Sequence, residues 1–475
     1  MPIDINLLRP DRGGNPETVK ESQRRRNASV ELVDTVMALD AEAKAARYKV
    51  AFSMNAKINE LNKKIGALMK AGEKEKVPPV KEDKKKLEAE KVELERLAVD
   101  AESRLETELA KIGNIVHESC IVSNDEENNA VQDCYWPNSR SEQADRDRRD
   151  KLLSPDFAAG VPGLLSHHEV LAKIKGYDQD RGVKVAGHRG YFLTGPGVDL
   201  NLAIIRYALD FLEKRDFSKL WTPFFMKKDM MAKTAQLEDF DEALYNITGD
   251  RDADGKENAD TMKYLIATSE QPISAYHAGE WFSEPEKELP KKYAGQSTCF
   301  RKEAGCHGKE TWGIFRVHQF EKVEQFCLTE PSKSWEMLEE MIQNSRDFYQ
   351  SLKLPYRVVS IVSGALNNAA AKKYDLEAWF PYQAEYKELV SASNCTDYQT
   401  RSLEIRYGAK KMKDPIKHYV HALNSTLAAT SRTICCILEN YQTEEGVTIP
   451  EVLVPYMNGK TFIPFPKAPE KVEKK

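Results

Sequence analysis

The chain has 475 residues, enough for two or three domains, and carries a net charge of −5. Hydrophobic residues make up 41% and charged residues 31%, which is typical of a globular protein with a strongly solvated helical part. The negative net charge excludes a protein that coats nucleic acid indiscriminately. No apolar run approaches the roughly 18 residues of a membrane span, which predicts a cytoplasmic protein with no membrane partner. The eight cysteines form no CxxC pair, which argues against a zinc site or a disulfide framework.

The first predicted element is an antiparallel hairpin of two long helices. Spacings of three and four residues mark a coiled-coil seam at Ala51, Met54, Ile58, Leu61, Ile65 and Leu68. Upstream, Asp40, Lys44 and Arg47 occupy seam positions, which predicts a poorly sealed middle. Pro78 and Pro79 predict a turn over Glu73–Val80, because a helix interior does not accept proline. The second helix has an apolar face of Leu87, Leu94, Leu97, Ala101, Leu105, Leu109 and Ile112. Each helix would reach about 45–60 Å, too long for a compact core.

The tip of this hairpin is rich in lysine. Between Lys57 and Lys91 there are 11 lysines and 7 acidic residues. Any contact with nucleic acid is therefore expected to be local and to weaken as the salt concentration rises. Taken alone, the seam and the lysines equally describe a structural coiled coil with a solvated surface.

The rest of the chain changes character twice. Polar loops and helices from about His117 to Val183 predict a connector. Beyond it, short strand-like runs alternate with helices without a βαβ repeat, so we expect an α+β domain with an antiparallel sheet. These runs are Tyr191–Leu193, Val358–Val362, Ala378–Phe380 and Glu388–Ser391. The predicted division is an arm at 1–117, a connector at 118–183, a catalytic domain at 184–463 and a disordered basic tail at 464–475, with a flexible insertion at Gly249–Ala259.

The densest group of charged residues lies between Phe300 and Phe326. Two strand-like runs flank the loop Ala304–Thr311, and strand alternation puts Arg301 and Glu303 on one face. On the returning strand, alternation gathers Arg316, His318, Phe320, Lys322 and Glu324. Arginines and carboxylates are costly to bury unpaired, so this face predicts an anionic, planar and polar ligand, that is, a nucleotide.

Three segments resemble the signature motifs of class II aminoacyl-tRNA synthetases. The order F-R-x-E, a loop, then F-R-x-x-x-F-x-x-x-E from Phe300 to Glu324 resembles the second motif. Ile204–Phe225, a helix followed by the extended run WTPFF, resembles the first, which packs the dimer interface in this class. Leu423–Gln442, where small residues open a helix with Arg432, resembles the third. Its usual glycine-rich run is replaced by residues 424–426, as in eukaryotic seryl-tRNA synthetases.

The resemblance implies a role for each motif residue. Arg301 would bridge the α-phosphate of ATP and the amino acid carboxylate, Glu303 would hold the adenine amino group, and Phe320 would stack on adenine. Arg316 and Arg432 would bind the outer phosphates, so the implied catalytic residues are Arg301, Arg316 and Arg432. The implied ATP-binding set is Arg301, Lys302, Glu303, Arg316, Val317, His318, Gln319, Phe320, Glu388, Leu389, Val390, Ser391 and Arg432.

The amino acid is indicated by a second group of residues. The run Thr268–Glu270 resembles the serine-binding T-x-E element of seryl-tRNA synthetases, and Glu324 matches the carboxylate that receives the serine hydroxyl. The implied serine-binding set is Thr268, Ser269, Glu270, Arg301, Glu324, Asn424 and Thr426. In the family, Glu388 and Ser391 match a pair that contacts ATP and the metal, and hard oxygen ligands of this kind suit Mg²⁺.

Together these motifs resemble a cytosolic seryl-tRNA synthetase over most of the chain. The resemblance implies a homodimer that activates L-serine with ATP and charges tRNA(Ser), gripping the tRNA with the N-terminal arm. Three alternatives stay open: a catalytically inactive relative that regulates another process, a coiled-coil scaffold, and a class II synthetase for threonine or alanine. The complete set of motif residues argues against the first. The charged sheet face argues against the second. The hairpin, and the absence of a Cys/His cluster with metal-ligand spacing, argue against the third.

Overall fold

The computed structural model describes residues 3–137, 140–152, 164–234, 243–251, 255, 258, 261–303, 312–409 and 417–466. The chain divides into two compact units, Met1–Ile115 and Val116–Lys475. The separate connector at 118–183 and the tail at 464–475 stay predictions. In the described part of the chain, no helix is both long enough and apolar enough to cross a membrane.

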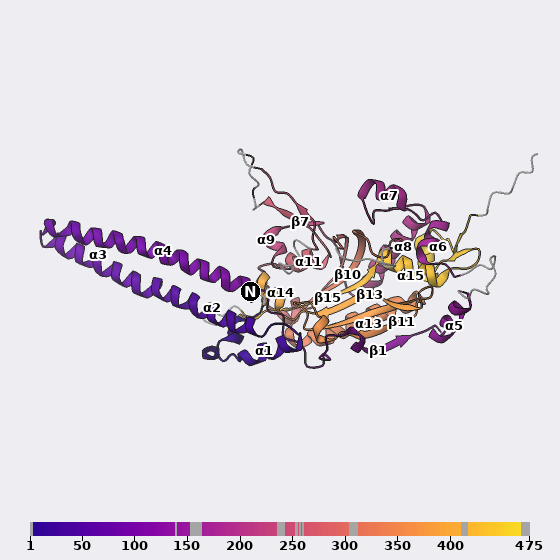
Figure 1. The fold of residues 1–475 in the computed structure, drawn as a ribbon, viewed down its shortest axis with the longest axis horizontal. Helices are drawn as coiled ribbons and strands as arrows, with labels where there is room; N and C mark the ends of the chain where they lie inside the picture. Colours follow the sequence, from indigo (N-terminus) through magenta and orange to yellow (C-terminus); the bar gives the residue numbers. More distant parts are fainter. Residues whose placement is uncertain are drawn as a thin grey trace, which may run out of the picture. The chain divides into compact units, whose positions relative to one another are not determined.

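The first unit is a helical hairpin, as predicted. A short helix α1 (Pro16–Arg25) precedes α2 (Glu31–Tyr48), which continues through a π-helical turn (Lys49–Met54) into α3 (Asn55–Lys70). The returning helix α4 (Val77–Leu109) runs beside α2 and α3 (Figure 1). Its 33 residues span about 50 Å. Along α3, the predicted seam positions Ile58, Leu61, Ile65 and Leu68 are partly covered, while most residues between them are exposed.

Two details of the hairpin differ from the prediction. Helix α4 already begins at Val77, so Pro78 and Pro79 lie in its first turn, where the missing N–H groups have no helical partner to lose. Leu97 was expected in the seam but is 44% exposed, and Ala98 is buried in its place. The helix period of 3.6 residues differs from the heptad period of 3.5. Along an unbroken helix of 33 residues, the buried position has therefore shifted by one residue.

The charged seam position Asp40, in the middle of the hairpin, is paired with Arg9, which lies before the hairpin in the chain. Asp40 is buried, and its Oδ2 accepts a hydrogen bond of 2.9 Å from Nε of Arg9. Lys44 also reaches this carboxylate, at 2.8 Å. These two cations hold the pKa of Asp40 below its usual value, against the opposing effect of burial. The charge at this seam position is therefore compensated.

The second unit is built on an eight-stranded sheet with the order β1-β11-β12-β13-β15-β10-β9-β4. All neighbours are antiparallel except β4 and β9, which run parallel. This confirms the α+β fold with an antiparallel sheet. The strands are β1 (Ala130–Tyr135), β4 (Ser218–Trp221), β9 (Lys291–Phe300), β10 (Gln319–Thr329), β11 (Tyr356–Ser360), β12 (Lys372–Phe380), β13 (Glu385–Asn394) and β15 (His421–Ala429).

Small sheets and helices surround the large sheet (Figure 1). The small sheets pair β2 (Tyr177–Asp178) with β3 (Phe192–Leu193), β5 (Phe225–Lys227) and β6 (Asn246–Ile247) with β7 (Lys263–Leu265), β8 (Trp281–Phe282) with β14 (Arg406–Tyr407), and β16 (Gly446–Thr448) with β17 (Phe462–Pro464). The helices are α5 (Glu142–Leu152), α6 (His167–Lys173), α7 (Gln179–Ala186), α8 (Pro196–Glu213), α9 (Lys228–Met231), α11 (Glu270–Tyr276), α12 (Pro285–Glu288), α13 (Ser334–Ser351), α14 (Tyr398–Leu403) and α15 (Thr430–Tyr441).

The main hydrophobic core joins α8, α13 and α15 to the sheet. Ile204 of α8, Ile342 of α13 and Ile437 of α15 are fully buried in one cluster with Leu376 and Leu423 of the strands. A second cluster packs Ile273 of α11 and Phe282 of β8 against Phe326 and Leu328 of β10. Strands β10, β13 and β15 are thus held by helices along their length, which makes them a rigid platform for side chains. Most of the predicted insertion at Gly249–Ala259, the loop Ala304–Thr311 and the end of the tail lie outside the described residues.

Candidate active site

A cavity of about 240 Å³ opens on the platform formed by β10, β13 and β15, where α11 and α15 begin. Its wall is mostly polar and charged, as expected of a site for a small charged ligand. The predicted site residues that line it are Thr268, Glu270, Arg301, Glu303, Arg316, Val317, Phe320, Glu324, Glu388, Leu389, Ser391, Asn424, Thr426 and Arg432. The structure therefore brings together the groups predicted separately for ATP and for serine.

Arg301 and Arg316 enter the cavity from irregular backbone. Strand β9 ends at Phe300 and β10 begins only at Gln319. The guanidinium of Arg301 lies 5.4 Å from the centre of the Phe320 ring, and Nε of Arg316 donates to Glu303 Oε2 at 2.6 Å. Both arginines thus converge on the space beside an aromatic ring, as a nucleotide with a charged phosphate tail requires.

Glu303 has an unusual backbone. Its φ is +48°, in the left-handed region that few non-glycine residues adopt. Its side chain is 10% exposed and pairs with Arg316. The expectation that strand alternation places Arg301 and Glu303 on one face is therefore wrong in its reason, since neither residue is in a strand. A sharp turn, not the strand pleat, directs both side chains into the cavity.

Arg432 lies in the first turn of α15. Its Nη1 donates to the backbone oxygen of Glu388 at 2.8 Å and lies 3.6 Å from that residue's carboxylate. The guanidinium also stacks over the Phe315 ring, 5.0 Å from its centre. The N–H groups at a helix N-terminus carry partial positive charge. Together with this arginine they suit an anion such as a phosphate.

Glu324 lies deep in the cavity and is compensated on two sides. It is 1% exposed and forms an ion pair with Lys322, which reaches it from two residues earlier on β10. Thr426 Oγ1 donates to Glu324 Oε2 at 3.4 Å, and Lys322 Nζ also donates to Thr268 Oγ1 at 2.7 Å. A buried carboxylate with these neighbours keeps lone pairs that a small hydroxyl group can use.

A second carboxylate, Glu270, lies at the start of α11. Its Oε1 accepts from Asn424 Nδ2 at 3.0 Å and from Gln399 Nε2 at 2.8 Å. Burial raises the pKa of Glu270, and the negative charge of Glu324 raises it further. With these two amide donors, the carboxylate is suited to a ligand that brings its own positive charge, such as the ammonium group of an amino acid.

A β-bulge on β15 sets the depth of this pocket. Val323 pairs with Ala428 and Glu324 pairs with Thr426, so Leu427 has no partner across from it. Beyond the bulge the alternation changes face: Thr426 lines the cavity whereas Leu427 belongs to the core. An unbroken strand would have directed residue 427 toward Glu324.

A second bulge, on β13, explains how Glu388 and Ser391 reach the same cavity. Residues three apart in a regular strand point to opposite faces. Here Leu376 pairs with Val390 and Glu377 pairs with Glu388, so Leu389 is the extra residue. Both Glu388 and Ser391 consequently line the cavity.

Some predicted site residues do not line the cavity. Ser269 is fully buried and donates to the oxygen of Gly295 at 3.4 Å. His318 and Gln319 line a neighbouring cavity of about 490 Å³. The expected alternation from Arg316 to Glu324 is wrong before β10 begins: Arg316 and Phe320 line the first cavity and His318 does not, although Phe320 also lines the second one. Lys302 and Val390 are also not in the cavity wall. The serine contact assigned to Ser269 and the ATP contacts assigned to the other four residues stay predictions.

The cavity also contains residues that were not assigned to the site. These are Phe315, Lys322, Asn367, Ser393, Ala429 and Ser431. The spacing of Lys322 between Phe320 and Glu324 on β10 was a usable signal, since it shares their face. Asn367 comes from the segment between β11 and β12 and carries no local pattern that could have identified it.

The two units match two known sequence families. Residues 3–116 match the seryl-tRNA synthetase N-terminal domain. Residues 251–441 match the tRNA synthetase class II core domain (G, H, P, S and T).

Relatives resemble this chain over its full length. It is 55% identical to the cytoplasmic serine–tRNA ligase of Schizosaccharomyces pombe, covering 98% of this chain and 97% of that one. The Saccharomyces cerevisiae protein of the same description is 54% identical, with 98% and 96% covered. The crystal structure of the cytoplasmic serine–tRNA ligase of Naegleria fowleri in complex with AMP has a TM-score of 0.78 and 49% identity, over 98% of this chain and 99% of that one. The Pyrococcus horikoshii seryl-tRNA synthetase complexed with ATP has a TM-score of 0.81 and 37% identity, over 98% and 100%. The chain therefore belongs to the seryl-tRNA synthetase family of class II synthetases.

Proposed function

We propose that the protein is a serine–tRNA ligase of the cytoplasm. It activates L-serine with ATP to seryl-adenylate and transfers the seryl group to the 3′ end of tRNA(Ser). The observation that carries this proposal is a single cavity lined both by the carboxylates of Glu270 and Glu324 and by the guanidinium groups of Arg301, Arg316 and Arg432. The first pair fits an amino acid with a hydroxyl group, and the arginines fit a triphosphate.

The first step needs positioning more than acid–base chemistry. A carboxylate oxygen of serine attacks the α-phosphorus of ATP, a new P–O bond forms, and the bond to pyrophosphate breaks with its electron pair leaving on pyrophosphate. Arg301 would hold the two reactants together, and Arg316 and Arg432 would stabilise charge on the outer phosphates. Phosphoryl transfer of this kind rests almost entirely on alignment and charge stabilisation.

The second step uses the same alignment. A terminal ribose hydroxyl of the tRNA attacks the carbonyl carbon of seryl-adenylate and an ester C–O bond forms. AMP leaves with the electron pair of the broken bond, and the hydroxyl proton passes to AMP or to solvent. No side chain of the protein forms a covalent bond in either step.

Selection of serine follows from Glu324. A buried carboxylate that hydrogen-bonds a substrate hydroxyl can reject the analogue without it by as much as ~10⁴-fold, because the carboxylate loses a partner. Alanine would be rejected in this way. Threonine would be rejected by its extra methyl group, since Thr426 packs directly against Glu324 and leaves little room.

Mg²⁺ fits the donor set at one edge of the cavity. Glu388 and Ser391 offer a carboxylate and a hydroxyl oxygen on one face of β13. No group of three or more metal-ligating side chains occurs in the described part of the chain. Two protein oxygens suit an ion that takes its remaining ligands from phosphates and water, as Mg²⁺ usually does. When bound, it would neutralise phosphate charge during activation.

The N-terminal unit would bind the tRNA. Its long hairpin carries the 11 lysines between Lys57 and Lys91, and most residues of α3 and of the first half of α4 are exposed. Lysines of this kind contact phosphates, which position an RNA without reading its bases. The predicted arm at 1–117 would therefore orient tRNA(Ser), while the domain predicted at 184–463 performs the chemistry.

The edge strand β4 supports a homodimer. Among the described residues it pairs only with β9, so its other edge is open in that part of the chain. Trp221 at its end is 71% exposed, and Phe225, at the end of the first motif, is also an exposed large apolar residue. An open edge with uncovered apolar side chains is a surface that a second copy of the chain would cover.

The alternative of an inactive regulatory relative lacks a supporting observation. Such a protein would be expected to have lost one of the phosphate-binding arginines or one of the two pocket carboxylates. All five line one cavity here.

The direct test is ATP–pyrophosphate exchange with the full-length protein. Serine should support exchange, and alanine and threonine should not. Glu324→Ala and Arg301→Ala should abolish it, while Glu336→Ala, which removes a carboxylate from the exposed face of α13, should leave it unchanged. Exchange supported equally by threonine or alanine would refute the serine assignment, and no exchange with any amino acid would favour the regulatory alternative.

A further inference from the structure

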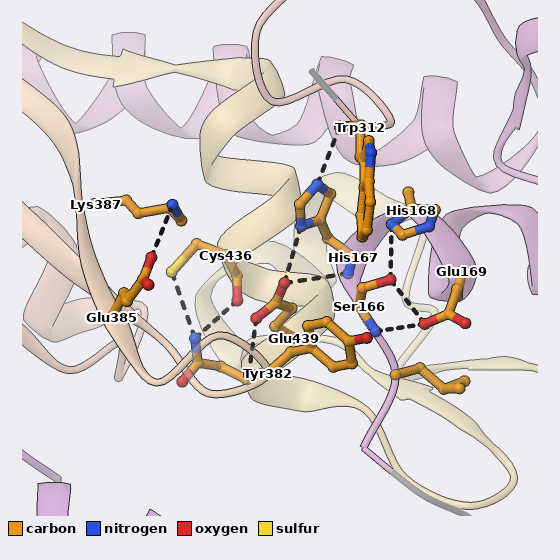
Figure 2. Close-up of polar contacts among 12 residues, drawn as sticks. Ser166, His167, His168, Glu169, Trp312, Tyr382, Glu385, Lys387, Cys436 and Glu439 are labelled. Atoms are coloured by element: carbon orange, nitrogen blue, oxygen red, sulfur yellow. Dashed lines mark hydrogen bonds and ion pairs between the residues drawn. The ribbon is translucent and has the colours of Figure 1, made fainter. Parts of the chain in front are cut away.

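A buried polar pair lies outside the cavity, between α6 and α15 (Figure 2). His167, the first residue of α6, is 2% exposed, and Glu439 on α15 is 1% exposed. His167 Nδ1 lies 2.9 Å from Glu439 Oε1, and His167 Nε2 lies 3.2 Å from the backbone oxygen of Trp312. The imidazole thus bridges the helix α15 and the segment that leads into Arg316.

Both ring nitrogens of His167 face oxygens that accept. The Trp312 carbonyl has no proton to give, and the Glu439 carboxylate already accepts backbone N–H groups from His167 at 3.2 Å and from Tyr382 at 3.1 Å. His167 and Glu439 thus form a buried polar pair, and each ring nitrogen of His167 has an oxygen partner. Such a pair is costly to bury and strongly disruptive to break, so we ask which neighbouring residues it holds in place.

Its location is next to the phosphate-binding arginines. Glu439 follows Arg432 by seven residues, about two turns, so both lie on one side of α15. Phe315 connects the two ends: its ring is 5.0 Å from the Arg432 guanidinium and 6.1 Å from the His167 ring. The residue after Phe315 is Arg316, and Phe315 itself lines the cavity.

The segment between Trp312 and Phe315 is pressed against α6. Gly313 has φ +60°, and a Cβ at this position would lie 2.8 Å from Cβ of His168. The Trp312 ring packs edge-on against the His168 ring at 5.0 Å. The backbone here has no strand to hold it, since β10 begins only at Gln319. The hydrogen bond between His167 and the Trp312 oxygen fixes the start of this segment, and the buried side chains of Ile314 and Phe315 anchor it in the core.

We infer that His167 is a positioning residue for ATP binding: its ring, oriented by Glu439, fixes the Trp312 carbonyl and thereby the backbone that carries Phe315 and Arg316. The inference rests on the proposed function and names how the phosphate-binding Arg316 keeps its position. His167 touches neither substrate. The serine pocket, built from α11, β10 and β15, does not contact this pair, so ATP and serine binding should respond differently to its loss.

Two substitutions separate the contacts of the ring. Glutamine places an amide nitrogen near the position of Nε2 and can still donate to the Trp312 oxygen, whereas asparagine places one near Nδ1 and can donate only to Glu439. We expect His167→Asn and His167→Ala to raise the KM for ATP in the exchange reaction by about tenfold, the loss of one hydrogen bond. His167→Gln should stay within about threefold of wild type, and the KM for serine should change less than twofold in all three.

His168→Ala is the matched control, because it removes the neighbouring ring but leaves the bond to the Trp312 oxygen in place. It should leave the KM for ATP within twofold of wild type. Melting temperatures of all variants separate positioning from folding, and if His167→Ala fails to fold, the comparison of His167→Gln with His167→Asn still decides. Equal KM values for ATP in these two variants, or a parallel rise in the KM for serine, would overturn the inference. Calorimetric titration with ATP alone repeats the test without serine, so a failure of the serine assignment would not be confused with a failure of this inference.

Discussion

Arg316 and Glu303 form an ion pair in the cavity, with 2.6 Å between Nε and Oε2. The resemblance assigns these residues to opposite ends of ATP: Glu303 to the adenine amino group and Arg316 to the terminal phosphate. Because the two side chains touch, both ends of the nucleotide must bind close together. We therefore expect ATP to bind with its phosphate tail folded back toward the base.

Neutralising Glu303 should weaken ATP binding without affecting serine. In Glu303→Gln the amide can no longer pair with Arg316 as a charge, and one of its two polar atoms presents a donor where the adenine amino group needs an acceptor. We expect the KM for ATP to rise about tenfold, as for the loss of a charged hydrogen bond. Steady-state exchange kinetics measure this, and an unchanged KM for ATP would remove Glu303 from adenine recognition.

Lys322→Met should damage the serine pocket. The substitution keeps the length of the side chain but leaves Glu324 buried without its cation, which typically costs about 3–5 kcal/mol. We expect a large rise in the KM for serine and a lower melting temperature. Lys292→Met is the control, since its ion pair with Glu340 lies at the other end of β9, where Glu340 is 40% exposed, and it should cost at most about 1 kcal/mol. Similar effects of the two substitutions would contradict the role of Lys322.

Serine binding should weaken in mild acid because of Glu270. Burial and the charge of Glu324 raise the pKa of this carboxyl, so it takes up a proton at a higher pH than an ordinary glutamic acid. The protonated form cannot attract the ammonium group of serine. The dissociation constant measured by calorimetry should therefore increase as the pH falls toward this raised pKa. Glu270→Gln should bind serine weakly at every pH, and a pH slope that persists in it must come from another group.

The raised pKa of Glu270 also predicts how the stability of the fold depends on pH. A carboxyl whose folded pKa is raised contributes stability below its unfolded pKa and loses that contribution as the pH rises through the folded value. Glu270→Gln should therefore raise the melting temperature at neutral pH but not at pH 4. A lower melting temperature at neutral pH would show that the carboxylate charge is well compensated.

Removing the hairpin should separate activation from charging. Nε of Arg26 donates to the oxygen of Asn114 at 2.9 Å, so the chain enters and leaves the hairpin at one place. Excising Glu31–Leu109 and joining the ends with a short glycine linker is therefore feasible. Serine-dependent exchange should stay within about twofold, since the catalytic unit has its own core, whereas tRNA(Ser) charging should collapse. Full charging by the excised protein would exclude the hairpin from tRNA binding.

Trp221→Asp should dissociate the expected homodimer. It puts a charge on the open edge of β4, where the indole is 71% exposed. Val131→Asp is the matched control, because Val131 is 56% exposed on β1, at the other edge of the same sheet. Sedimentation should show a monomer for Trp221→Asp and a dimer for Val131→Asp. A dimer in both would place the interface elsewhere.

The charged residues of the site could be predicted from sequence because their order along the chain is distinctive. Arg301, Glu324 and Arg432 were all reached through motifs, and all line one cavity. The reason given for Arg301, strand alternation, does not hold, because β9 has already ended. For Glu388 and Ser391, alternation would even have predicted opposite faces, and only the bulge brings them together.

Other features depend on contacts between distant parts of the chain. The closure of the hairpin at Asp40 depends on Arg9, 31 residues away, and the anchor at Trp312 depends on His167, 145 residues away. The helix period of 3.6 residues and the strand period of 2 residues each describe a single element, so they cannot predict a partner from a distant part of the chain. For the same reason, Leu97 and Ala98 could be told apart only by the returning helix itself.

The two bulges determine which side chains of β13 and β15 face the cavity. Leu389 and Leu427 are each one residue more than their partner strands require. A substitution at either position changes the packing behind the sheet, but deleting either residue would swap the faces of every side chain between the gap and the end of its strand. Outside the cavity wall, changes of amino acid type along β13 and β15 are therefore tolerable, whereas changes of length are not. The positions of the side chains in the cavity therefore depend on the number of residues in each strand, and they are kept when residues behind the sheet change type.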